Sequence, residues 1–129
     1  MDKKGFLKHL VFLMFFIFIA DLLARNFYWY SLIWYFDMIM HFLSGLWVGL
    51  FFFYVLSVKS PLAPSFKSFL KIILLVLIIG ISYEIFEFIM NVISVTPFDP
   101  VDTTSDLFFD MLGAAVSIFY FMKVVRLKK

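Results

Sequence analysis

The sequence contains no cysteine, and few of its residues are charged. Without cysteine there can be no disulfide framework, thiolate metal site or cysteine nucleophile. Asp, Glu, Lys and Arg make up only 16% of the 129 residues, whereas 64% are hydrophobic and 20 are Phe. A soluble protein of this length could not bury so much apolar surface, and large exposed apolar patches cause association. The composition therefore predicts a protein dissolved in lipid, and it argues against nucleic-acid binding and against a soluble enzyme.

Four segments of the chain are long and apolar enough to cross a bilayer, which takes ~20 mainly apolar residues in a helix. The fourth is the weakest, because Asp106 and Asp110 must face the bundle or its aqueous edge rather than lipid. The sequence therefore predicts an all-α membrane protein, a small bundle of four transmembrane helices that forms a single domain over residues 1–129. The expected spans are residues 6–24, 37–58, 69–93 and 105–125.

The connections between these spans have compositions of their own. Residues 25–36 are rich in Trp, Tyr and Phe, which favour the headgroup boundary, so we expect an interfacial turn or half-helix there. Residues 59–65 contain two prolines and two serines, which indicate a loop. Residues 94–104 also contain two prolines and are expected to be a loop, after which Thr104 or Ser105 can cap the fourth helix.

The basic residues are distributed unevenly along the chain. All but one lie near the start of the chain, at the second connection or near its end, and these places fall on one side of a four-span protein. Lys and Arg accumulate on the cytoplasmic side of membrane proteins. We therefore expect both termini in the cytoplasm, with only Arg25 on the outer side.

The acidic residues gather on the opposite side. Of the nine, only Asp2 is expected in the cytoplasm. The other eight fall at the outer edge of the bilayer or within ~10 Å of it, given ~1.5 Å of rise per helical residue. They are Asp21, Asp37, Glu84, Glu87, Asp99, Asp102, Asp106 and Asp110.

Within this layer the ionisable residues recur at helical spacing. Residues three or four positions apart share one face of a helix. Each of the last three spans contains such a pair, so the three faces could converge on one site. The pairs are Asp37 and His41, Glu84 and Glu87, and Asp106 and Asp110.

The acidic layer lacks enough basic partners. Only Arg25 is fixed positive there, and His41 can become so. Carboxylates that converge near a membrane cannot all stay charged and unpaired, so either several are protonated or a cation is bound. An oxygen-rich site suits Mg²⁺, Ca²⁺ or Mn²⁺, or Zn²⁺ through the imidazole. We expect the metal ligands to be Asp37, His41, Glu84 and Asp110, with Glu87 and Asp106 as the catalytic base or as supports for the ligands.

Simpler explanations exist for the individual residues. His41 could be a hydrogen-bonded group between helices, and Glu84 and Glu87 could be neutral acids that hold helices together. Asp21 could simply end a helix at the interface. Asp99 and Asp102 could be solvated loop acids. Chance placement of all the paired residues is less plausible, because intramembrane ionisable groups are costly.

Three stretches of the sequence resemble a known family. They run from Asp37 through His41 to Gly45, from Tyr83 to Phe88 and from Asp102 to Ala114, within residues 35–120. They are similar to YjdF-like small bacterial membrane proteins and, more distantly, to VanZ-like proteins.

Three features favour the YjdF-like group. VanZ-like proteins usually have Asn where Asp110 stands and Gln where Glu87 stands, and they tend to carry an Arg in the outer loop that this chain lacks. The resemblance implies a multi-pass protein of the bacterial cytoplasmic (inner) membrane. The VanZ name implies a loose link to glycopeptide-antibiotic tolerance and envelope chemistry, and the YjdF-like group implies no settled activity.

Three functions are compatible with this pattern. The first is a divalent-cation site that binds or acts on an envelope lipid or its phosphate headgroup, as a metal-dependent hydrolase or transferase. The second is a non-catalytic scaffold or partner subunit, and the third is a cation or proton carrier. The expected partners are membrane lipid and either a second copy of the chain or another membrane protein.

Overall fold

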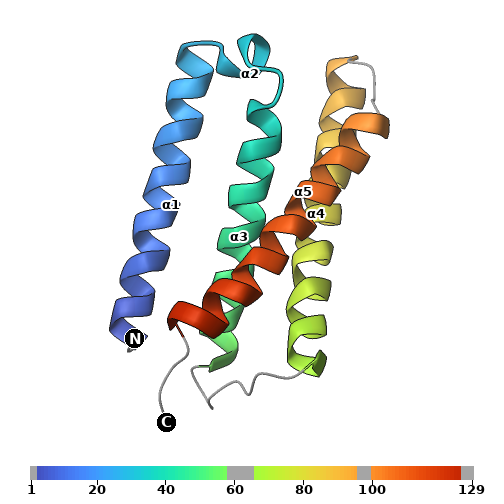
Figure 1. The fold of residues 1–129 in the computed structure, drawn as a ribbon. Coiled ribbons are helices and arrows are strands. Elements are labelled where there is room, and N and C mark those ends of the chain that lie inside the picture. Colours follow the sequence, from blue (N-terminus) through green and yellow to red (C-terminus); the bar gives the residue numbers. More distant parts are fainter. Residues whose placement is uncertain (1–2, 58–65, 96–99, 126–129) are drawn as a thin grey trace.

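The computed structural model describes residues 3–57, 66–95 and 100–125, and these residues are almost entirely helical. No strand occurs in these three stretches. Four of the helices are long and apolar enough to cross a membrane, which confirms the predicted fold class (Figure 1). The elements are α1 (Lys3–Asn26), α2 (Trp29–Leu32), α3 (Phe36–Ser57), α4 (Phe66–Ser94), α5 (Pro100–Tyr120) and the π-helical turn η1 (Phe121–Val125).

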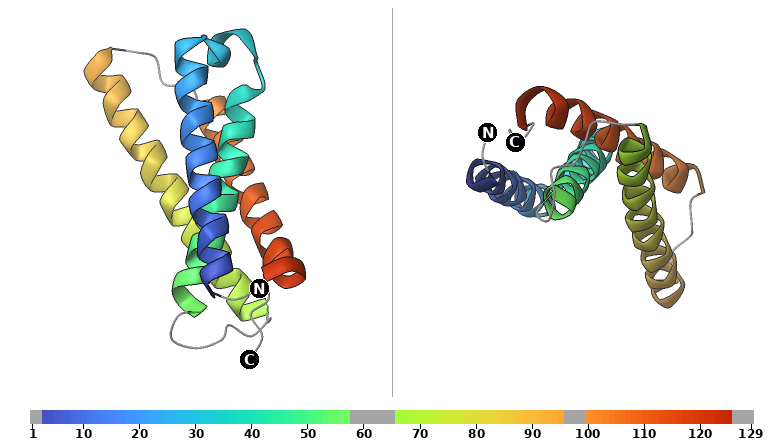
Figure 2. Two further views of the ribbon diagram at one scale, coloured as in Figure 1. Left: turned by 90° about the vertical axis from the view of Figure 1, so that its left-hand side faces the viewer. Right: turned by 90° about the horizontal axis from the view of Figure 1, so that it is seen from below.

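The helices are arranged around a close pair formed by α3 and α5. Helix α1 packs against α3, and α4 packs against α5 and α3. Seen along the bundle in Figure 2, α1 and α4 diverge from the central pair on different sides. The C-terminal ends of α1 and α4 and the N-terminal ends of α3 and α5 lie at the same end as α2, which we call the α2 end (Figure 1).

The contact between α3 and α5 depends on glycine. A Cβ atom added at Gly45 would collide with the backbone carbonyl of Asp110, and one added at Gly113 would collide with the carbonyl of Phe42. The two backbones therefore touch directly, as small residues allow between membrane helices. This contact brings the first turns of α5 against the first turns of α3.

Aromatic side chains fill the opposite end of the bundle. The rings of Phe53 and Phe121 stack with centroids 4.2 Å apart, and Phe6 from α1 lies against Phe121 at 6.2 Å. Beside them, Nδ1 of His9 lies 2.8 Å from the hydroxyl of Tyr120 in a hydrogen bond between α1 and α5. These contacts join the first and last described helices at the end away from the acidic residues.

The outer surface of the bundle is apolar. Phe12, Phe18, Ile78 and Phe108 each expose more than half of their surface. A water-soluble monomer rarely exposes apolar side chains in contiguous patches of this kind. The arrangement fits a bundle whose solvent is the lipid acyl chains.

Helix α5 begins earlier than the sequence indicated. The prediction that Pro100 to Thr104 form a loop is wrong, because α5 starts at Pro100. Proline suits the first turn of a helix, where its fixed φ is already helical and its missing N–H has no partner to lose. Thr104 is therefore not a cap; its hydroxyl donates to the Pro100 carbonyl at 2.9 Å inside the helix.

The other predicted boundaries differ less from those in the structure. Helix α4 starts three residues before the expected residue 69. The expected half-helix within residues 25–36 corresponds to α2. The predicted loop at residues 59–65, together with Pro97 and Asp99, lies outside the described residues.

Replacing Gly113 with alanine should destabilise the bundle by about 1–3 kcal/mol, the usual cost of overpacking. The added methyl group would meet backbone, which cannot move aside as a flexible side chain can. Alanine is intrinsically the better helix former by about 1 kcal/mol, so a loss of stability must come from the helix contact. Thermal unfolding in detergent measures it. Ala115→Val, at an exposed position of the same helix, should change little, and an equal loss in both variants would contradict the explanation.

Candidate functional site

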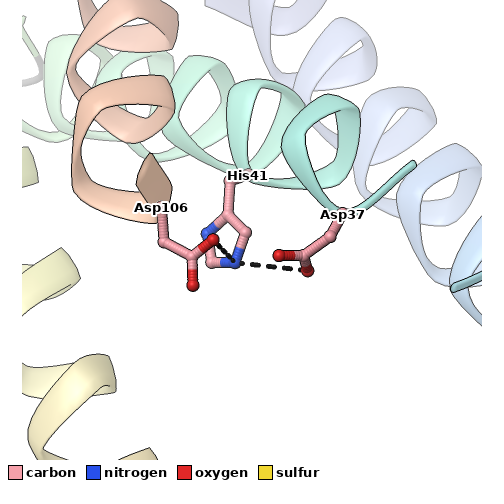
Figure 3. A group of neighbouring side chains, drawn as sticks. All are labelled: Asp37, His41 and Asp106. Atoms are coloured by element: carbon pink, nitrogen blue, oxygen red, sulfur yellow. Dashed lines mark ion pairs between the residues drawn. The ribbon is translucent and has the colours of Figure 1, made fainter. Parts of the chain in front are cut away.

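The paired ionisable residues of α3, α4 and α5 meet at the α2 end of the bundle. Asp37, His41 and Asp106 offer ligand atoms that all lie within 4.8 Å of one another, and Figure 3 shows the two carboxylates flanking the imidazole. Glu84 and Glu87 form a second such group with the same Asp106. The convergence follows from helical spacing within each element and from the close approach of α3 and α5.

His41 is the centre of the first group. Its Nε2 lies 3.4 Å from Oδ1 of Asp106 and 3.6 Å from Oδ1 of Asp37. The imidazole is largely buried, with 13% of its side chain exposed. Two carboxyl oxygens beside one ring nitrogen repel each other unless a proton or a metal ion lies among them.

Asp110 contacts the other nitrogen of the same ring. Its Oδ1 lies 3.2 Å from Nδ1 of His41, so a proton on Nδ1 would be donated to this carboxyl group in a hydrogen bond. Gly80 on α4 leaves room for this carboxylate, since a Cβ there would lie 2.8 Å from Oδ2 of Asp110. A histidine whose Nδ1–H is held by a carboxylate presents Nε2 in the orientation typical of metal-binding histidines.

Two carboxylate oxygens in the site are buried without a hydrogen-bond partner among the described residues. They are Oδ1 of Asp106 and Oε1 of Glu84, in side chains from residues that are only 2% and 6% exposed. Leaving a polar group buried and unsatisfied costs about 1–3 kcal/mol, and more for a charged one. Each of these oxygens needs a proton or a cation.

The spacing of the ligand atoms is compatible with a bound ion. Oxygens around Mg²⁺ lie about 2.0–2.1 Å from it, so those on opposite sides are about 4.2 Å apart. The ligand atoms of each group lie within 4.8 Å of one another. A shift of about half an ångström, well within side-chain motion, would therefore suffice to close either group around a metal.

The site opens into a pocket of about 690 Å³. Along α1, α3 and α4, most polar lining residues lie nearer the α2 end and most apolar ones lie deeper, whereas α5 contributes only acidic residues. The deeper residues are Met14, Ile17 and Phe18 of α1, Val48 of α3, and Val76 and Ile79 of α4. Asp37, His41, Glu87, Asp106 and Asp110 all line this pocket, whereas Glu84 lies behind its wall.

A second polar network in the same pocket involves residues that the sequence did not single out as a unit. Arg25 Nε donates to Asp21 Oδ2 at 3.0 Å, and the Tyr30 hydroxyl donates to Asp21 Oδ1 at 2.6 Å. All three residues line the pocket. Asp21 thus lies inside α1 and does not end the helix. Its spacing to Arg25 could have indicated the ion pair, whereas the contact with Tyr30 depends on the turn between α1 and α2.

That turn reverses the chain through an uncommon backbone conformation. Tyr28 has φ of 59°, in the left-handed region that non-glycine residues seldom adopt. The reversal brings Tyr30 back onto Asp21. Burial, together with the hydrogen bond to Asp21, raises the pKa of Tyr30 well above its usual value.

The structure thus brings together all six residues predicted to form a site: Asp37, His41, Glu84, Glu87, Asp106 and Asp110. Asp106, which was expected to act as a base or support, contributes potential ligand atoms to both groups. Asp110, which was expected to be a metal ligand, instead lies against the far side of the imidazole. Asp102 lines the pocket but belongs to neither group, and Asp99 lies outside the described residues. The roles assigned to these residues stay predictions.

A family model described as predicted membrane protein (DUF2238) matches residues 3–126. The chain belongs to the DUF2238 family. The match includes all four membrane helices and therefore every residue of the site. No curated protein and no solved structure matches the chain.

Tyr30→Phe should lower the stability of this DUF2238 protein by about 0.5–1.5 kcal/mol at neutral pH, the value of a typical hydrogen bond. The pKa of Tyr30 is raised in the folded state, so the contribution is complete below the unfolded value of about 10 and declines as the pH rises above it. The difference from the wild type should therefore shrink in alkaline solution. Chemical unfolding at several pH values measures this. Tyr28, which is exposed, provides the control. If Tyr28→Phe lowered the stability as much as Tyr30→Phe does, the loss could not be assigned to the hydrogen bond between Tyr30 and Asp21.

Proposed function

We propose that this protein binds a divalent cation at the α2 end of its pocket and uses it to engage the phosphate headgroup of a membrane lipid. Mg²⁺, Mn²⁺, Ca²⁺ and Zn²⁺ all suit carboxylate oxygens with one imidazole. The observation that carries the proposal is the pair of buried carboxylate oxygens, on Asp106 and Glu84, that have no hydrogen-bond partner in the part of the chain that the structure describes.

The charge balance of the pocket supports a cation. Among the described residues, six acidic ones line it, against one permanently charged base, Arg25, and that base is already paired with Asp21. Like charges in a water-poor site repel strongly, because the effective dielectric constant is low. A divalent ion would convert this repulsion into attraction.

The shape of the pocket supports a lipid as the ligand. From Val76 to Glu87, both in its wall, α4 rises about 16 Å. The apolar lining lies deep in the bundle, and the polar groups lie toward its end. A ligand with an apolar chain and an anionic headgroup matches this order. Helices α1 and α4 flank the pocket and diverge, so a chain could pass between them from the bilayer (Figure 2).

Two features support chemistry on the headgroup. A bound divalent ion polarises a phosphoryl oxygen and lowers the pKa of a coordinated water. Glu87 is half-buried and faces the pocket, so the carboxylate oxygen that does not bind metal is placed to accept a proton from such a water, as the base of a hydrolase or transferase. Arg25, at the same end of the pocket, offers donors that suit phosphate.

The distribution of basic residues also supports an orientation of the protein in its membrane. The basic residues near the ends of the chain and at residues 59–71 favour cytoplasmic termini. The site would then face the outer leaflet of a bacterial cytoplasmic membrane, where the distant resemblance to VanZ-like proteins also points to envelope chemistry.

A scaffold role is the alternative that a specific observation favours. If Nε2 of His41 carries a proton, its contacts with Asp37 and Asp106 are ion pairs that hold α3 and α5 together. Such a cluster would fix helix positions without binding a ligand. The response of stability to metal separates the two roles.

Adding Mn²⁺ or Mg²⁺ to the metal-free protein should raise its thermal stability, by about 2.7 kcal/mol at a concentration 100-fold above Kd. Asp106→Asn should abolish this gain. The same substitution should make the metal-free protein more stable, because it removes one of several crowded negative charges. Thermal unfolding with and without each cation measures both effects.

Asp21→Asn is the matched control, since Asp21 lines the same pocket but pairs with Arg25. It should retain the gain from metal. If no cation stabilises the wild type, and Asp106→Asn weakens it, the cluster is a scaffold.

Arg25→Gln should weaken binding of a phosphate-monoester lipid at least about tenfold, because a hydrogen bond to a charged group contributes about 1.5–3 kcal/mol. The measurement uses tail-labelled phosphatidic acid in mixed micelles with Mn²⁺, and phosphatidylcholine as the comparison lipid. Lys71→Gln, which removes an exposed positive charge from the other half of α4, is the control. Equal losses in both variants would show general attraction of anionic lipid and would contradict a role for Arg25.

A further inference from the structure

Asp106 belongs to two groups of potential metal ligands at once. One group adds Asp37 and His41 of α3, and the other adds Glu84 and Glu87 of α4. A carboxylate has two oxygens with about four lone-pair positions, so it can serve two ions. In Figure 3 one Asp106 oxygen lies toward the imidazole and the other points away from it.

We propose that Asp106 bridges two divalent cations, one held by the α3 group and one by the α4 group. This rests on the proposed function, because a second ion presupposes that the site binds metal. The α3 group, with its imidazole, suits Mn²⁺ or Zn²⁺, and the all-oxygen α4 group suits Mg²⁺ or Mn²⁺.

The buried oxygens without partners argue for an ion in each group. Oδ1 of Asp106 lies beside Nε2 of His41, in the α3 group, and Oε1 of Glu84 lies in the α4 group. Both residues are more than nine-tenths buried. With an ion in the α3 group alone, the Glu84 oxygen would depend on a proton, whereas a second ion would satisfy it directly.

The charge balance of the two groups also favours two ions. As metal ligands, Asp37, Glu84, Glu87 and Asp106 would each be ionised and would give the two groups four negative charges, while His41 would be neutral with Nε2 bound to metal. One divalent cation would leave two negative charges in a largely buried site, whereas two cations neutralise all four. Asp110 remains engaged with Nδ1 of His41.

A bridged pair of ions would give the pocket a defined chemistry. Ions about 3.5–4 Å apart can hold two oxygens of one phosphate group and stabilise both the attacking and the leaving oxygen of a displacement. Asp37, His41, Glu87 and Asp106 all face the pocket, so such a phosphate could reach both ions from one side. The ligand class is therefore a phosphate ester bound by two oxygens.

Manganese binding to the purified full chain tests the proposal. Equilibrium dialysis of the metal-free protein against Mn²⁺ should give two ions per chain. Electron paramagnetic resonance at low temperature should show the spectrum of an exchange-coupled pair in place of the six-line signal of an isolated ion. The double variant Glu84→Gln/Glu87→Gln should bind one Mn²⁺ with an uncoupled signal, and so should Asp37→Asn/His41→Gln. Asp21→Asn should keep both ions and the coupling.

The wild-type result is decisive even if a variant fails to fold. Two coupled ions support the bridge. One ion, or two uncoupled ions, would overturn the bridge and leave the proposed cation site intact. No bound Mn²⁺ would overturn the proposed function as well.

Discussion

The direct backbone contact between α3 and α5 is the constraint on which the rest of the molecule depends. Gly45 and Gly113 allow the two helices to approach until carbonyl groups occupy the space where side chains would stand. At that distance the first turns of α5 lie against His41, and Asp106 and Asp110 reach opposite nitrogens of one imidazole. A pair of helices separated by ordinary side chains would leave these carboxylates out of reach of the ring.

The concentration of negative charge at the α2 end is costly in a protein that has so little charge elsewhere. Most of its surface is apolar, and the described helices expose large aliphatic and aromatic side chains along their length. Against this background, the burial of Asp106 and Glu84 with unpartnered oxygens is not what helix packing alone would favour, because apolar residues of similar size would pack without the desolvation cost.

Sequence periodicity predicts which residues share a face, and the six predicted residues do lie close together in the structure. It does not predict how one helix is rotated against another. Asp106 and Asp110 are equivalent in a helical repeat, and only the Gly45–Gly113 contact decides which of them meets Nε2 of His41 and which meets Nδ1. The early start of α5 could have been anticipated from proline's preference for the first turn of a helix. The hydrogen bonds around Tyr30 could not have been anticipated, because they depend on the left-handed backbone conformation of Tyr28. Glycine or asparagine usually marks such a position in a sequence, and tyrosine does not.

The divergence of α1 and α4 on either side of the pocket has a consequence for how any ligand is encountered. A molecule that arrives between these helices comes from the plane of the bilayer, by two-dimensional diffusion (Figure 2). Its effective concentration is then its mole fraction among neighbouring lipids, and dilution of the aqueous phase leaves occupancy unchanged.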